Sequence, residues 1–311
     1  MTKQITLREA ITKEDISVFW EQLHAYHRRD IFPNLKDEED LAYFLDDTKY
    51  RNQIQKLHDR PQDRCHYLFF CSGGHEIGFA MMVIYNTEDG KCFLMEFCVY
   101  PQFRGGGMGK QCAKAFLEWA AERGASYTEL NYSRSKQRFR FWNSLGFLPN
   151  GTDEWGEPLM MLPPEDKQPI TVELLADPED WQLMKLENGL LTEVGEKCLT
   201  DERKERLSKA AADRKILFFM AKRGSRAVGM CSVATCFSTF SCGATGYFDN
   251  FYVEPVFRCQ GIARKLAKAA QDWCCQNGVA CLTVCCAPCD EEMYQELGFA
   301  KRLGSAYTFL C

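Results

Sequence analysis

Apolar residues occur along the chain in two kinds of run. Short runs such as "YLFFCS" (67–72), "EIGFAMMVIY" (76–85) and "CFLMEFCVY" (92–100) are separated by turn signals. These runs predict strands joined as hairpins. Two longer segments, "GKQCAKAFLEWAAERG" (109–124) and "IARKLAKAAQDWCCQNG" (262–278), predict helices, and both end on glycine, as helices often do.

The same order of elements occurs twice. Arg258 follows Arg104 by 154 residues (258 − 104), and Gly278 follows Gly124 by the same number. Each half opens with a predicted strand, continues with charged helical sequence that is longer in the first half, and then has hairpins, a glycine loop and a helix. We therefore predict the α+β class, with a strand–loop–helix–strand unit at the centre of each half.

A proline-rich segment divides the two halves. "LPPEDKQP" (162–169) has three prolines and several charges, which is typical of a linker. The predicted domains are residues 1–163 and 170–311, joined by a linker at 164–169, and each is of ordinary domain size.

Composition sets limits on the class of protein. The 311 residues are 46% hydrophobic and 26% charged, and the formal net charge is −5. No apolar run reaches 18 residues, and the start, "MTKQITLREA", has no apolar signal core. We expect a cytoplasmic protein with no membrane and no nucleic-acid partner, and the acidic balance weakly favours cationic substrates. The sequence does not decide between a monomer and a homodimer.

The sequence contains 17 cysteines. In a reduced compartment most of them are expected to be small buried side chains. Cys286 and Cys289 have the spacing of a redox pair or of half a metal site, but no second such pair completes a zinc site. His24 and His27 lie three residues apart without a zinc motif, so we expect them to be solvated or at the edge of the core. We therefore predict no metal site, and a thiol-redox role for the cysteine pair stays an alternative.

Two similar loops are candidates for anion binding. "VYPQFRGGGMGKQ" (99–111) and "VEPVFRCQGIARK" (253–265) each lie between a predicted strand and a predicted helix. A tight turn at a helix N-terminus exposes unpaired N–H groups, which suits a phosphate or pyrophosphate. The first loop fits neither the dinucleotide fingerprint nor the P-loop, because Lys110 and Gln111 stand where those motifs need glycine and serine or threonine. The alternative for a single loop is a simple helix-cap turn.

Together the two loops resemble the GCN5-related N-acetyltransferase (GNAT) family. That family has Arg or Gln, two residues, Gly, one residue, and Gly or Ala; this chain has "RGGGMG" (104–109) and "RCQGIA" (258–263). Each follows a Val-x-Pro strand end, and each half has a late Gly-Phe. The resemblance covers nearly the whole chain and implies two GNAT-like domains, each with a splayed central strand pair.

The resemblance implies acetyl-CoA as the cofactor. Its pyrophosphate would lie on the loop amides, and its pantetheine arm would pair with the strand before each loop. The residues that the resemblance assigns to the cofactor are, in the first half, Phe97, Cys98, Val99, Arg104, Gly105, Gly106, Gly107, Met108, Gly109 and Lys110, and in the second half, Phe251, Tyr252, Val253, Arg258, Cys259, Gln260, Gly261, Ile262, Ala263 and Arg264.

The candidates for proton transfer differ between the halves. In the family the general acid is a tyrosine four residues before the late glycine, which is Tyr294 here, whereas Trp142 takes that place in the first half and has no phenolic proton. Candidate bases on the strands are Glu96 and Asp249. Strand alternation puts these two acids on opposite faces unless a bulge intervenes.

The predicted function is acetyl-CoA-dependent transfer of an acetyl group to a primary amine of a small molecule, an amino acid or a peptide. The second half is favoured as the catalyst because of Tyr294. Activity of both halves, or a non-catalytic module that senses CoA, are the alternatives. The identity of the amine is not readable from the sequence.

Overall fold

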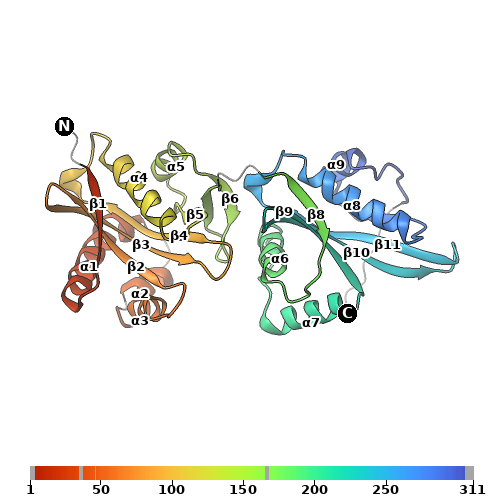
Figure 1. Cartoon of the computed structure of the whole chain (residues 1–311), viewed down its shortest axis with the longest axis horizontal. Helices are drawn as coiled ribbons and strands as arrows, with labels where there is room; N and C mark the ends of the chain where they lie inside the picture. The colour runs from red at the N-terminus through yellow and green to blue at the C-terminus, as the bar shows by residue number, and fades with distance from the viewer. Residues whose placement is uncertain (1–3, 35–37, 46, 165–167, 305–311) are drawn as a thin grey trace. The chain divides into compact units, whose positions relative to one another are not determined.

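The computed structural model describes residues 4–34, 38–45, 47–164 and 168–304 (Figure 1). The chain divides into two compact units, one of Met1–Leu148 with Leu159–Pro164 and one of Pro149–Pro158 with Glu165–Cys311. The domain limits at 163 and 170 stay a prediction. Residues 165–167 of the predicted linker lie outside the described part of the chain.

The first sheet has the order β1-β2-β3-β4-β5-β7-β6. β4 and β5 run parallel, whereas the pairs β1–β2, β2–β3, β3–β4 and β5–β7 are antiparallel. The strands are β1 (Ile5–Glu9), β2 (Cys65–Ser72), β3 (His75–Tyr85), β4 (Lys91–Val99), β5 (Tyr127–Asn131), β6 (Leu148–Thr152) and β7 (Pro158–Leu162).

Helices cover both faces of this sheet, because its central strands are apolar on both sides. On one face the core joins Phe19, Trp20 and Leu23 to Phe79, and on the other it joins Phe116 to Leu94. The first face carries α1 (Lys13–Tyr26), a π-helical turn (His27–Ile31), a 3-10 turn (Phe32–Asn34), α2 (Glu38–Leu45) and α3 (Asp47–His58); the second carries α4 (Met108–Ala121), preceded by a 3-10 turn (Pro101–Phe103), and α5 (Lys136–Asn143).

The second sheet repeats the plan with the order β12-β11-β10-β9-β8. Only the β11–β12 pair is parallel among its described pairings. Its elements are β8 (Ile170–Leu174), α6 (Trp181–Glu193), α7 (Asp201–Ala212), β9 (Ile216–Arg223), β10 (Arg226–Ser238), β11 (Gly243–Val253), a 3-10 turn (Pro255–Phe257), α8 (Ile262–Gln276), β12 (Leu282–Val284), a 3-10 turn (Pro288–Asp290) and α9 (Glu291–Glu296).

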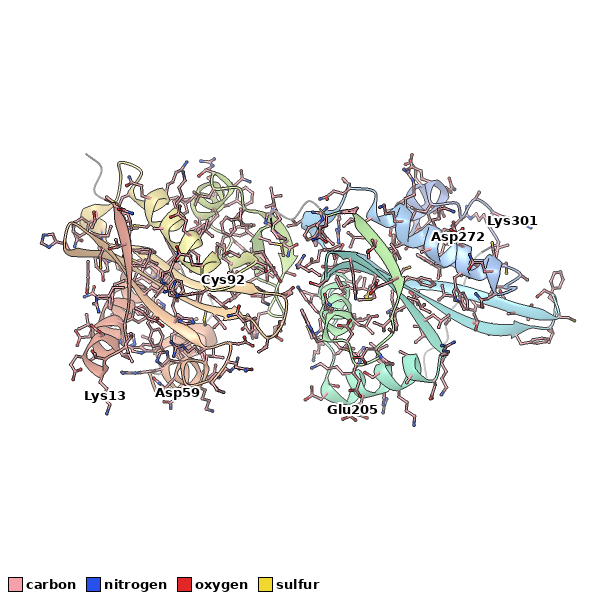
Figure 2. All side chains as sticks on the ribbon, in the orientation of Figure 1. Lys13, Asp59, Cys92, Glu205, Asp272 and Lys301 are labelled. Atoms are coloured by element: carbon pink, nitrogen blue, oxygen red, sulfur yellow. The ribbon has the colours of Figure 1, made fainter. Side chains whose placement is uncertain are left out.

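The predicted α+β class is therefore confirmed. Figure 2 shows Cys92 within the first sheet, where it is buried, whereas Lys13, Asp59 and Glu205 are exposed at or just beyond their helices. None of the described helices is long and apolar enough to cross a membrane. The described cysteines are free thiols, Cys286 and Cys289 included, and the described residues form no cluster of three metal-ligating side chains.

Candidate functional site

The central parallel strands of each sheet separate partway along their length. β4 pairs with β5 only as far as Leu94 opposite Leu130, and β11 pairs with β12 only as far as Phe248 opposite Val284. Beyond these points β4 runs on to Val99 and β11 to Val253. Within the described part of the chain, this edge of each strand is open, so an extended ligand can pair with it. The splayed central strand pair is confirmed.

Both open strands carry a β-bulge. In β4 the extra residue is Met95, which lies between Glu96 opposite Met81 and Leu94 opposite Met82. In β11 the register shifts by one residue between Tyr252 opposite Met230 and Asp249 opposite Ser232. A bulge adds one residue to one strand and so reverses the alternation of side chains beyond it.

The bulges place the two candidate bases on the same rung. Glu96 lies opposite Met81, and Asp249 lies opposite Ser232. Met81 and Ser232 are equivalent positions of the two halves, because each lies three residues after the matching glycine, Gly78 or Gly229. Residues opposite one another on paired strands share a face of the sheet. The expectation that the two acids lie on opposite faces is therefore wrong, because simple alternation does not hold across the bulge.

The two predicted loops lead into α4 and α8. Gly107 and Gly261 are the N-caps, with φ of +81° and +78°, and neither helix has a side-chain cap. In contrast, Thr12 and Asp180 cap α1 and α6 through their side chains. No atom lies within 4 Å of a Cβ added at Gly107 or Gly261, so a ligand can approach the main chain there. These uncapped amides suit an anion.

The loop arginines turn back toward the strands. Arg104 Nε donates to the carbonyl of Val99 at 2.7 Å, and Arg258 Nε donates to that of Val253 at 2.9 Å. The outer nitrogen of each guanidinium forms an ion pair with a helical-region acid, Asp30 in the first half and Glu193 in the second. These side chains brace the loop, so the main chain of the loop is the part that faces a ligand.

In the first half, Glu96 is joined to a buried histidine. Its Oε1 lies 2.7 Å from Nε2 of His27, which is 1% exposed and surrounded by the rings of Phe32, Phe44 and Tyr50. The expectation of a solvated or edge position for His27 is therefore wrong. Burial, with a contribution from Glu96, raises the pKa of the Tyr50 hydroxyl well above its ordinary value. Glu96 is thus a carboxylate in a nearly closed aromatic environment.

In the second half, the buried carboxylate comes from a helix. Both oxygens of Glu187 accept from Asn250 Nδ2, at 2.8 and 3.0 Å, and Asn250 Oδ1 accepts from the Ser232 hydroxyl at 3.0 Å. Glu187 is 3% exposed, whereas Asp249 is exposed. Burial raises the pKa of Glu187 to about 7; the hydrogen bond from Asn250 opposes this rise and the charge of Asp249 adds to it.

Sequence reasoning did not identify Glu187. A signal was present, because Leu183, Leu186 and Glu187 lie on one face of α6, so the glutamate occupies a position of the apolar stripe. Its partner Asn250 is 63 residues away in sequence, and no local pattern links them.

Tyr294 and Trp142 occupy matching places. The Tyr294 ring lies 6.0 Å from Phe251 and 5.9 Å from Phe299. Trp142 lies 5.2 Å from Phe97 and also packs on the late Gly-Phe of its half. Burial, assisted by the charge of Asp290, raises the pKa of Tyr294 to about 12, so its hydroxyl keeps its proton at neutral pH. The tyrosine packs directly on the open strand.

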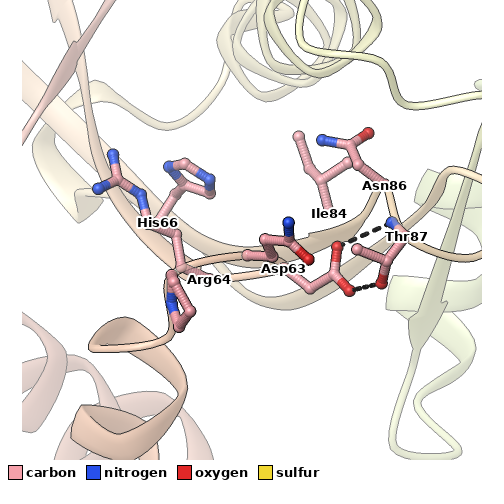
Figure 3. Close-up of a pocket in the computed structure, with 8 residues that line it drawn as sticks. Asp63, Arg64, His66, Ile84, Asn86 and Thr87 are labelled. Carbon is pink, nitrogen blue, oxygen red and sulfur yellow. Dashed lines mark hydrogen bonds between the residues drawn. The ribbon is translucent and has the colours of Figure 1, made fainter.

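The described residues of the first unit line at least two surface pockets. One of about 460 Å³ is formed by the α3–β2 and β3–β4 connections (Figure 3), where both Asp63 carboxylate oxygens accept from Thr87. Another of about 360 Å³ is basic and aromatic, at the start of α5. Their lining residues are Pro61, Gln62, Asp63, Arg64, His66, Ile84, Asn86 and Thr87 for the first and Tyr132, Arg134, Lys136, Phe139 and Arg140 for the second, none of which is a predicted site residue.

Comparison with known proteins gives one family. The model of the acetyltransferase (GNAT) family matches residues 20–147 and, separately, residues 181–299. No curated protein matches the sequence.

Solved structures that are similar to the chain each correspond to about half of it. Glucosamine-6-phosphate N-acetyltransferase from Arabidopsis thaliana is 17% identical, with a TM-score of 0.40 over 46% of this chain and 100% of that one. A predicted acetyltransferase with acetyl-CoA from Clostridium acetobutylicum is 16% identical, with a TM-score of 0.40 over 46% and 96%. An aminoglycoside acetyltransferase from an uncultured soil metagenomic sample, in complex with sisomicin, is 19% identical, with a TM-score of 0.41 over 46% and 95%.

Proposed function

Because the chain belongs to the acetyltransferase (GNAT) family, which matches it in both halves, we propose that it is an acetyl-CoA-dependent N-acetyltransferase. Its acceptor is a primary amine of a small molecule, an amino acid or a peptide. The second half is the principal catalyst. The observation that carries this choice is Tyr294, a protonated hydroxyl packed on the open strand next to Phe251.

The residues of both halves fit the cofactor of this family. Each unit has an open strand edge for an extended arm and an uncapped helix start for a pyrophosphate. Acetyl-CoA, when bound, supplies an acetyl group activated as a thioester. Residues 96–99 and 250–253 offer the strand edge, and the loops at 104–110 and 258–264 offer the amides. Cys259 and Gln260 do not prevent this, because backbone groups do the binding.

Tyr294 is proposed as the general acid of the second half. Amine acetylation leaves a thiolate, which departs more readily when a nearby acid gives it a proton. The phenol is protonated at neutral pH and packs on the strand that the pantetheine arm would follow. Trp142 offers no such proton in the first half.

Activity of the first half is the second candidate. It is favoured by the His27–Glu96 pair, a carboxylate held at the bulge by a buried imidazole. Such a half would take a proton from the amine through Glu96 and protonate the leaving thiolate from solvent. A non-catalytic module that senses CoA remains the alternative for a chain that turns over no amine.

An amine-library screen tests the proposal. The full chain is mixed with acetyl-CoA and each amine, and free thiol is measured. We expect thiol release with a subset of amines, and loss of that release in Gly261→Asp. Cofactor binding without thiol release for any amine would favour the sensing module. Release that survives Gly261→Asp and disappears in Gly107→Asp would assign catalysis to the first half.

A further inference from the structure

Glu187 has no cationic partner. Among the described side chains, no lysine, arginine or histidine forms an ion pair with it, and Asp249 is the charged group that acts on it most strongly. Its hydrogen-bond partner, Asn250 on β11, is neutral, and Asn250 in turn accepts from the neutral Ser232 hydroxyl on β10. A buried carboxylate without a cation is costly when ionised, so a purely structural role would be better filled by an amide.

The first half has a matching link between helix and strand. There the strand supplies the carboxylate, Glu96, and the helical region supplies its partner, His27. In the second half the carboxylate, Glu187, comes from α6, and its partner on the strand is Asn250. Asn250 lies three residues before Val253, as Glu96 lies three residues before Val99, and it directly follows Asp249, which shares the rung of Glu96. Each half therefore has one carboxylate of low exposure next to its bulge, although different elements supply it.

The bulge residue itself is fixed by this link. Asn250 has a φ of +49°, a left-handed backbone that asparagine tolerates better than most residues. Its side chain is held on both sides, by Glu187 and by Ser232. The carboxylate of Glu187 is thereby positioned beside the open strand, with Asp249 exposed next to it.

We infer, on the basis of the proposed function, that Glu187 is the proton acceptor of the second half, and that the acceptor amine arrives as an ammonium ion attracted by the exposed Asp249. The base, Glu187, is hydrogen-bonded to Asn250, and the acid, Tyr294, packs on the adjacent residue Phe251. Asn250 contacts α6 and Phe251 contacts α9, so the base and the acid reach β11 from different helices.

The proton and electron balance is complete with these two groups. Glu187 takes one proton from the ammonium, which frees the nitrogen lone pair to form the N–C bond as the C–S bond breaks toward sulfur. Tyr294 gives its hydroxyl proton to that sulfur and regains one from the newly bonded nitrogen. Glu187 then releases its proton to solvent, so the net products are the amide, the free thiol and one proton.

Two substitutions separate a base from a structural glutamate. Glu187→Gln keeps the length of the side chain and a carbonyl acceptor for Asn250, but it cannot accept a proton. Glu187→Asp is shorter and packs less well, but it keeps the carboxylate. A base predicts that kcat/KM falls in the order wild type, Asp, Gln, with the Gln variant on the order of 10²-fold below wild type. A structural role predicts that Gln is the better replacement, and Gln equal to or above Asp overturns the inference.

The pH dependence of kcat/KM provides a second test. Wild-type kcat/KM should show an ionisation near pH 7 that is absent from Glu187→Gln. An ionisation that persists in Glu187→Gln would assign the base elsewhere, to Asp249 first, and would overturn the inference. Affinity for acetyl-CoA should stay within about twofold of wild type in both variants, which separates chemistry from loss of the site.

A third test measures the titration of the carboxyl group without cofactor. In protein with isotope-labelled glutamate carboxyl groups, nuclear magnetic resonance should show one carboxyl that titrates near pH 7 and is missing from Glu187→Gln. If no glutamate titrates there, the inference fails even where the enzyme is active. If wild type releases no thiol with any amine, the proposed function fails, and the resonance still reports whether Glu187 is poised to accept a proton.

Discussion

Glu187 of α6 and Asn250 of β11 form a bidentate link, 2.8 and 3.0 Å long, at the bulge of the second sheet. His27 and Glu96 make the corresponding link in the first sheet, with the carboxylate on the strand instead of on the helix. The two halves therefore each have a glutamate next to the bulge, supplied by the strand in the first half and by the helix in the second.

The pKa of Glu187 predicts a dependence of stability on pH. Its folded pKa, about 7, is above the ordinary glutamate value of 4.5, so its contribution to stability is full below about pH 4.5 and is lost as the pH rises through 7. Relative to Glu187→Gln, wild type should lose about 3 kcal/mol of unfolding free energy across this range. Denaturant unfolding of the second unit between about pH 5 and pH 8 measures the difference.

The control for that experiment is Glu205→Gln. Glu205 is exposed on α7 and should leave the pH profile of stability unchanged. Parallel profiles for wild type and Glu187→Gln would show that Glu187 titrates alike in the folded and unfolded states.

The His27–Glu96 pair predicts an asymmetry between two substitutions. Glu96→Ala leaves the Nε2 of a 1% exposed imidazole without its acceptor, so the first unit should lose about 1–3 kcal/mol of stability. Glu96→Gln keeps an acceptor and should lose less. Thermal unfolding of both variants measures the order. Equal losses would mean that the contact contributes nothing beyond packing.

The glycine N-caps predict a charge effect on cofactor binding. Gly107 has a left-handed backbone, in which asparagine and aspartate are similarly tolerated, so Gly107→Asn and Gly107→Asp differ mainly in charge. The aspartate would repel a pyrophosphate at the helix start, and its affinity for acetyl-CoA should be more than about tenfold below that of the asparagine variant. Calorimetry should count two sites in wild type and one in Gly107→Asp.

The same pair of substitutions at Gly261 should remove the other site. Equal affinities for the Asn and Asp variants at both positions would mean that no anion lies on these helix starts.

The sequence predicted the loops and the sheets because both depend on residue type. Left-handed turns at Gly107 and Gly261 need glycine, and the apolar runs of β2, β3 and β4 follow from two-sided burial. The bulges were not predictable, because one extra residue in β4 or β11 leaves no mark in composition. The Glu187–Asn250 and His27–Glu96 links were not predictable either, because each joins residues more than 60 positions apart through tertiary packing.

The side chains of Arg104 and Arg258 show what a motif leaves open. The resemblance assigns the amides of these loops to the cofactor, and that assignment stays a prediction. The structure adds a role for the side chains, which donate to the carbonyls of Val99 and Val253. The motif alone does not say that these side chains serve the loop.

Tyr294→Phe tests the assignment of catalysis to the second half most directly. The substitution keeps the ring against Phe251 and Phe299 and removes only the hydroxyl. Tyr247→Phe, at an exposed position of β11, is the matched control and should behave as wild type. With an amine identified by thiol release, kcat of Tyr294→Phe should fall on the order of 10²-fold while affinity for acetyl-CoA stays within about twofold. An unchanged kcat for Tyr294→Phe, with Gly261→Asp inactive on the same amine, would contradict the role of Tyr294 as the general acid.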